Sequence, residues 1–144
     1  MSARDPGPLF DLRVLLFAIL VVPRLRRLPP AELARRLEPP EGTRPDPPLS
    51  AEAAEALGRR IDRLLQRARP LVRPGCLTRG ITRYRFLRRA GADVALCFGL
   101  TRREGGVAGD GHCWLTLAGQ PLAERRDPRP VYLETFRLPG GAIP

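Results

Sequence analysis

The hydrophobic period of this chain changes once, at Gly91, and that change most constrains the fold. Apolar residues recur every three or four positions in residues 54–68, whereas they alternate in residues 94–100. Helices are expected over residues 10–22, 29–37, 50–68 and 76–90, and strands over 93–100, 112–118, a segment from about 121, and 131–138. Helices followed by neighbouring strands predict the α+β class, with an antiparallel sheet and one helix packed on it.

Prolines divide the helical part of the chain. Five of the 17 prolines lie in residues 38–49, a composition that predicts a stiff, extended linker. We therefore expect an N-terminal helical region over residues 1–70 and a core over residues 71–144. A length of 144 residues suits one domain, or one domain with a helical appendage.

Positive charge dominates the chain. Its formal net charge is +10, every basic residue is arginine, and residues 69–103 hold nine arginines against one aspartate. A local basic patch attracts anionic partners such as nucleic acid, a membrane surface or an acidic peptide. No nucleic-acid recognition motif accompanies the charge, so we expect no nucleic-acid partner.

The apolar run at residues 14–22 is too short to cross a membrane. Nine helical residues rise roughly 14 Å, about half of a hydrocarbon core. The run also lacks the flanks of a secretory signal. Three cysteines are an odd number without a CxxC pair, which favours a reducing compartment, so a cytoplasmic protein without a membrane span is expected.

One cysteine and the only histidine carry the candidate chemistry. Cys76 lies in the first turn of a predicted helix, where unpaired backbone N–H groups stabilise a thiolate. In the strand HCWLTLA, His112 and Trp114 share the face opposite Leu115, so His112 is expected to point out of the core or into a cleft. A thiol at a helix start and an imidazole on a following strand form a minimal nucleophile–base pair.

The other two cysteines are typical of small buried residues. Cys97 lies mid-strand among apolar neighbours, and Cys113 faces the core. Because His112 and Cys113 are adjacent in a strand, they point to opposite faces and cannot share one tetrahedral ion. Neither a metal nor a cofactor is therefore expected.

The segments CLTRGITRYRFLRRAGADVALCFGL and GHCWLTLAGQPLAE resemble the stand-alone leader peptidases of lasso-peptide biosynthesis, which are transglutaminase-like cysteine peptidases. The similarity runs from about Cys76 to Glu124. It implies a papain-like catalytic triad that cuts a ribosomally made precursor between leader and core, after which an asparagine-synthetase-like cyclase closes the macrolactam. Cys76 matches the nucleophile and His112 the general base, while Glu124 stands where the family has aspartate.

The third member of this triad has two candidates. If the turn before the third strand holds two loop residues (119 and 120), Asp127 lies opposite His112; a three-residue loop with a bulge instead puts Glu124 diagonal to it. We prefer Glu124, because the family spacing fits without a gap, and we keep Asp127 as the alternative.

The family resemblance and the length of the chain together predict the partners of this protein. Arg79, Arg83 and Trp114 are the expected contacts to the precursor peptide. The chain has no room for a further recognition domain of about 80 residues, so a separate leader-binding protein is expected. The alternatives are an arginine-rich nucleic-acid-binding protein, a transglutaminase-like acyl transferase and a non-catalytic scaffold; the helix over 10–22 either packs internally or docks a partner.

Overall fold

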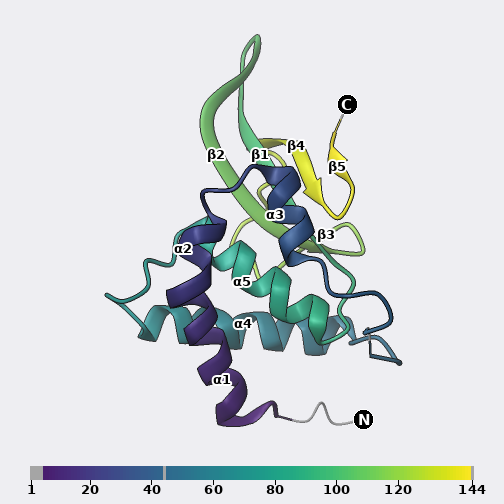
Figure 1. Ribbon diagram of the computed structural model, residues 1–144. Coiled ribbons are helices and arrows are strands. Elements are labelled where there is room, and N and C mark those ends of the chain that lie inside the picture. The colour runs from purple at the N-terminus through teal and green to yellow at the C-terminus, as the bar shows by residue number, and fades with distance from the viewer. Residues whose placement is uncertain (1–4, 44, 144) are drawn as a thin grey trace.

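The computed structural model describes residues 5–43 and 45–143, in which helices precede a five-stranded antiparallel sheet (Figure 1). The helical elements are α1 (Gly7–Leu16), the π-helical turn η1 (Phe17–Val21), α2 (Val22–Leu25), α3 (Pro30–Leu37), α4 (Ala51–Arg67) and α5 (Cys76–Arg89). The strands are β1 (Val94–Arg103), β2 (Gly106–Leu117), β3 (Gln120–Leu122), β4 (Tyr132–Leu138) and β5 (Gly141–Ala142). The predicted α+β class is confirmed.

The first helical stretch continues past Pro23, where the sequence predicted its end. The turn η1 widens the helix, so that the Val22 N–H donates to the Phe17 carbonyl five residues earlier. Pro23 then falls in the first turn of α2, where a missing N–H costs little. The prediction of a stop at Pro23 was wrong because a π-helical turn accommodates the proline.

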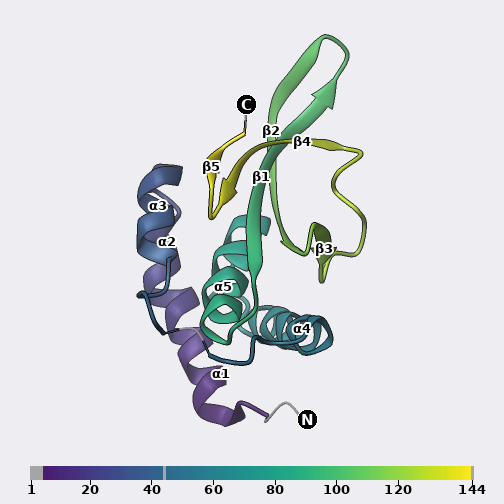
Figure 2. The same cartoon turned by 90° about the vertical axis from the view of Figure 1, so that its right-hand side faces the viewer.

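Helix α4 follows its sequence pattern. The Ser50 hydroxyl accepts a hydrogen bond from the Ala53 N–H at 3.2 Å, which confirms the predicted N-cap. Ala54, Ile61 and Leu65 are fully buried on its inner face. This face holds α4 beneath α5, while α5 itself lies between α4 and the sheet (Figure 2).

The sheet has the strand order β3-β2-β1-β4-β5, and its longest pair is the hairpin β1–β2. We expected residues 101–111 to form a glycine-rich loop, but most of them continue the ladder to the Arg103–Gly106 pair, with one bulge after Leu100. Backbone hydrogen bonding needs no side chains, so the glycines remain in the strand, and Gly105 with φ 83° forms the turn.

Gly80 sets the distance between α5 and the sheet. A Cβ built on it would lie 2.9 Å from Leu96 Cδ1 and 3.1 Å from Cys113 Sγ, closer than packed atoms normally approach. A larger residue here would require the side chains of Leu96 and Cys113 to shift. The start of α5 is thereby positioned against the sheet.

One cluster of buried side chains joins the N-terminal helices to the sheet. Phe17, Leu37 and Ala54 belong to the same cluster as Ile81 and Leu115. The segments before and after residue 70 thus share a core.

Candidate active site

Cys76 is the first residue of α5. Its N-cap, Gly75, is extended and supplies no side-chain acceptor to the first turn. The backbone N–H groups of that turn are left free of a side-chain cap, and the positive end of the helix dipole lies beside the thiol. The predicted placement of Cys76 at a helix start is confirmed.

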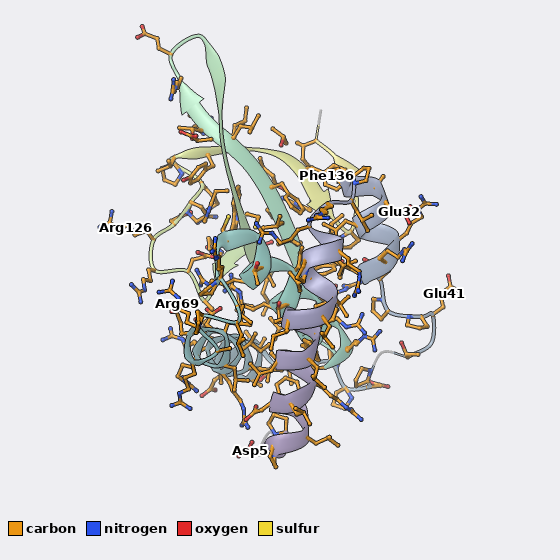
Figure 3. All side chains as sticks on the ribbon, turned by 60° about the vertical axis from the view of Figure 1, so that its left-hand side comes forward. Asp5, Glu32, Glu41, Arg69, Arg126 and Phe136 are labelled. Carbon is orange, nitrogen blue, oxygen red and sulfur yellow. The ribbon has the colours of Figure 1, made fainter. Side chains whose placement is uncertain are left out.

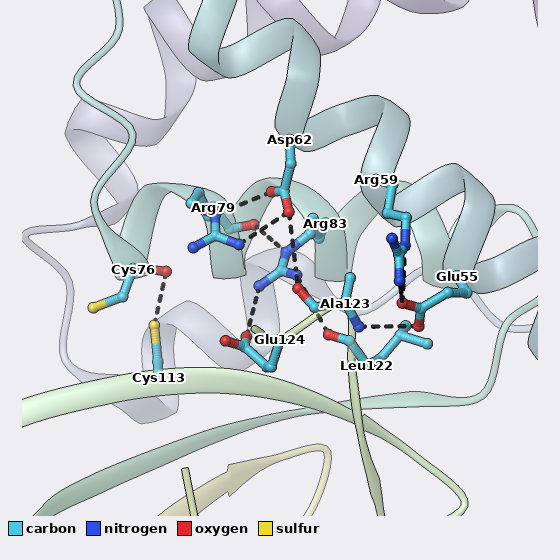
Figure 4. Close-up of polar contacts among 10 residues, drawn as sticks. All are labelled: Glu55, Arg59, Asp62, Cys76, Arg79, Arg83, Cys113, Leu122, Ala123 and Glu124. Atoms are coloured by element: carbon cyan, nitrogen blue, oxygen red, sulfur yellow. Dashed lines mark hydrogen bonds and ion pairs between the residues drawn. The ribbon is translucent and has the colours of Figure 1, made fainter. Parts of the chain in front are cut away.

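A short neighbouring strand leaves room for Cys76 at the edge of β2. Strand β3 pairs with β2 only from Leu115 to Leu117, so residues 112 and 113 have no partner strand on that side. The start of α5 lies there, and the Cys113 thiol donates to the Cys76 carbonyl oxygen at 3.0 Å (Figure 4). Because Cys76 lies beyond the end of β3, it meets residues from both faces of β2.

Three groups on β2 favour the charged form of Cys76. Hydrogen bonding by the Cys113 thiol, then by His112, and then by the Cys113 backbone N–H lowers the pKa of Cys76 to about 4, against the opposing effect of burial. Cys76 and His112 therefore lie close enough to interact, while their pairing as nucleophile and base stays a prediction. At neutral pH this thiol is a thiolate, the nucleophilic form.

The other two thiols are held in the neutral form. Burial, followed by the charge of Glu134, raises the pKa of Cys97 to about 11. The hydrogen bond to Cys76, together with burial, raises the pKa of Cys113 well above its usual range. Their prediction as buried structural residues is confirmed, since both are at most 3% exposed.

Aromatic rings hold the imidazole. His112 stacks on Tyr132 with ring centroids 4.9 Å apart and planes 27° apart, and its ring lies 6.1 Å from that of Trp114. These contacts restrict rotation of the ring. The sequence analysis missed Tyr132, which comes from β4, because no local pattern links that strand to residue 112.

Gly99 makes the aromatic layer possible. It lies opposite His112 in the β1–β2 ladder, and a Cβ on it would lie 2.9 Å from the Trp114 ring and from the Leu133 carbonyl oxygen. The Trp114 ring occupies the space above this glycine, where its Nε1 is buried without a hydrogen-bond partner among the described residues.

Neither candidate acid forms a hydrogen bond with His112 among the residues that the structure describes. Glu124 accepts from Arg83 at 3.1 Å, and Asp127 accepts from Arg129 at 2.7 Å. Both register predictions for β3 were wrong: Ala118 and Gly119 form the turn, so Leu117 pairs with Gln120. Ala123, with φ 53°, follows the last residue of β3, so Glu124 lies outside the β2–β3 ladder and is paired in it with neither Cys113 nor His112. The charge of Glu124 raises the pKa of Cys113, which shows that Glu124 lies near the thiols.

The predicted peptide contacts are largely committed to the protein itself. Arg79 donates two hydrogen bonds to Asp62, at 2.9 and 3.1 Å. Arg83 is 1% exposed and donates to Glu124 and to three backbone carbonyl groups (Figure 4). Trp114 is also 1% exposed. Burial leaves Arg83 and Trp114 almost no surface for a bound peptide, which does not fit their predicted role.

Within the described residues, no group of three or more histidine, cysteine or acidic side chains could hold a metal ion. No helix in the same part of the chain is long and apolar enough to cross a bilayer.

A helix-start thiolate beside a strand imidazole, on an α+β core, is the architecture of a cysteine-dependent acyl-transfer fold. The family model described as the transglutaminase-like superfamily matches residues 15–137, and the chain belongs to this superfamily. Folds of this superfamily commonly carry cysteine-dependent enzymes, both papain-like peptidases and acyltransferases. No curated protein and no solved structure matches the chain.

Proposed function

We propose that this protein is a cysteine peptidase that removes the leader from a ribosomally made lasso-peptide precursor, with Cys76 as nucleophile and His112 as general acid and base. The catalytic part is supported by the position of Cys76 at the start of α5 and by its lowered pKa, to which hydrogen bonding by Cys113 and then by His112 contributes. The choice of substrate rests on the sequence resemblance from Cys76 to Glu124.

The chemistry follows the usual order for a thiol peptidase. The Cys76 thiolate attacks the scissile carbonyl carbon, and protonated His112 gives its proton to the leaving amine as the C–N bond breaks. Water, deprotonated by His112, then attacks the thioester and releases the acid. The Cys76 backbone N–H, at the start of α5, is a suitable donor to the oxyanion.

Glu124 remains the preferred third member of the proposed triad. Its carboxylate lies near the thiols and is held by buried Arg83, whereas the surface pair between Asp127 and Arg129 makes no contact with the site among the described residues. In the triad role, Glu124 leaves Arg83 and accepts a hydrogen bond from the imidazole when the precursor is bound.

The proposal includes two partner proteins. A separate leader-binding protein presents the precursor, and an asparagine-synthetase-like cyclase uses the freed amine of the core. Omitting the leader-binding protein is expected to slow cleavage, because no segment of the described chain forms a further recognition domain; tight binding of the leader by the chain alone would contradict this part.

Cleavage of a synthetic lasso-peptide precursor, in the presence of a leader-binding protein, tests the proposal by mass spectrometry. Cys76→Ala is expected to abolish the leader and core products, while Cys97→Ala, which removes a fully buried thiol whose pKa is raised, retains cleavage. Unchanged cleavage by Cys76→Ala would refute the proposal.

Acyl transfer is the second candidate, because the same thioester forms before water or an amine attacks it. A peptide amide substrate supplied with hydroxylamine distinguishes the two outcomes. A hydroxamate formed in place of the acid product, at low hydroxylamine concentration, would favour the acyl transferase.

A further inference from the structure

A groove of about 980 Å³ lies between α1 with η1, α4 and the last turns of α5. Arg85, Phe86 and Arg89 line it from α5, at the opposite end of that helix from Cys76. Thirteen residues of helical rise separate Cys76 from Arg89, or about 20 Å. The groove is thus a different surface from the candidate active site.

The groove has an apolar floor. The Phe86 ring lies edge-on to Phe10 and to Phe17, with ring centroids 5.5 and 5.6 Å apart. At the margin, Leu16 is 47% and Leu20 is 55% exposed. Exposed leucines that continue an aromatic floor form an apolar patch of the kind that marks an interaction site.

Arginines surround this floor. Five of them line the groove: Arg13, Arg60, Arg63, Arg85 and Arg89. Arg60 is neutralised by Asp11 and Asp5, the latter at the start of α1 (Figure 3). The other four have no ion-pair partner in the described part of the chain, and the guanidinium of Arg85 lies over the Phe17 ring at 4.6 Å.

The four arginines without an ion-pair partner in the described part of the chain indicate which kind of ligand the groove binds. An apolar floor binds apolar side chains, and four unneutralised guanidinium groups around it require carboxylates at the edges of the bound segment. A nucleic acid would satisfy the arginines but would leave the aliphatic margin of Leu16 and Leu20 without an apolar partner. A flat bilayer surface would not fill a concave site.

We propose that this groove binds an acidic amphipathic helix of a partner protein, whose apolar face packs on Phe10, Phe17 and Phe86 and whose carboxylates pair with Arg63 and Arg89. A helix about 10 Å in diameter fills the groove volume with about two turns. Such a helix-in-groove contact is a recurrent mode of protein recognition.

Fluorescence anisotropy tests the proposal with a labelled 18-residue peptide of leucine and glutamate arranged as an amphipathic helix. Saturable binding is expected, and the double charge reversal R63E/R89E weakens it about tenfold, because two exposed charge pairs become repulsions. The matched control R102E/R103E changes the net charge equally at exposed arginines in the β1–β2 hairpin and leaves binding within about twofold.

Three outcomes would overturn the proposal. Equal weakening by R63E/R89E and R102E/R103E indicates only general attraction to a basic protein. Equal binding of a peptide with the same composition but scrambled order indicates that no amphipathic face is read. Binding to phosphatidylglycerol vesicles, without binding to the peptide, assigns the surface to a membrane. If R63E/R89E lowers the melting temperature, the neutral variant R63Q/R89Q takes its place, and unaltered peptide binding by it refutes the proposal.

Discussion

The reactivity of Cys76 toward an alkylating reagent should be almost independent of pH between 6 and 8. With a pKa of about 4, the thiol is already ionised throughout this range. An ordinary cysteine, with a pKa of about 8.5, is about 0.3% ionised at pH 6 and about 24% at pH 8, so its rate rises about 75-fold. The predicted change for Cys76 is less than about twofold, since the thiolate is the reacting species.

Iodoacetamide labelling followed by peptide mass spectrometry measures this rate for each cysteine separately. Cys97 and Cys113 act as internal controls, because each is buried and the pKa of each is raised. Glutathione in the same tube reports the behaviour of an unperturbed thiol. A Cys76 rate that climbs about tenfold per pH unit from 6 to 8 would refute the thiolate assignment.

Four further substitutions test the site. His112→Ala removes a hydrogen bond that lowers the pKa of Cys76, so the midpoint of the alkylation profile should move to higher pH; an unmoved midpoint would disprove their contact. Gly99→Ala places a methyl group 2.9 Å from the Trp114 ring and should cost about 1–3 kcal/mol of unfolding free energy, measured by urea denaturation, whereas an unchanged midpoint would contradict this packing. Glu124→Gln should slow precursor cleavage at least about tenfold, while Asp127→Asn should change the rate by less than about twofold. If Asp127→Asn slows cleavage more than Glu124→Gln does, Asp127 is the third member of the triad.

Patterns among neighbouring residues were sufficient to predict the helices and strands that surround the candidate active site. The Ser50 cap, the change of period after Gly91 and the start of α5 at Cys76 each depend on neighbouring residues and on backbone chemistry. Contacts between residues that are far apart in the sequence could not be predicted in this way. Tyr132 meets His112 only because β4 pairs with β1, and the sequence between them contains no feature that fixes this pairing.

The register of β3 shows where local rules mislead. Ala118 adopts φ 51°, a left-handed conformation that costs a residue with a Cβ about 1–2 kcal/mol, so a turn at Gly119 and Gln120 was the more natural prediction. Pairing of Leu115 with Leu122, and burial of Leu122 in the main core, outweigh this cost. Because the strand ends at Leu122, Glu124 lies outside the ladder, and its spacing from His112 could not predict its position.

The packing of α5 on the sheet is sensitive to substitution of Gly80. A bulkier residue there would press on the side chains of Leu96 and Cys113, and Cys113 is a hydrogen-bond partner of Cys76. A comparison restricted to Cys76 and His112 would not detect a substitution at Gly80.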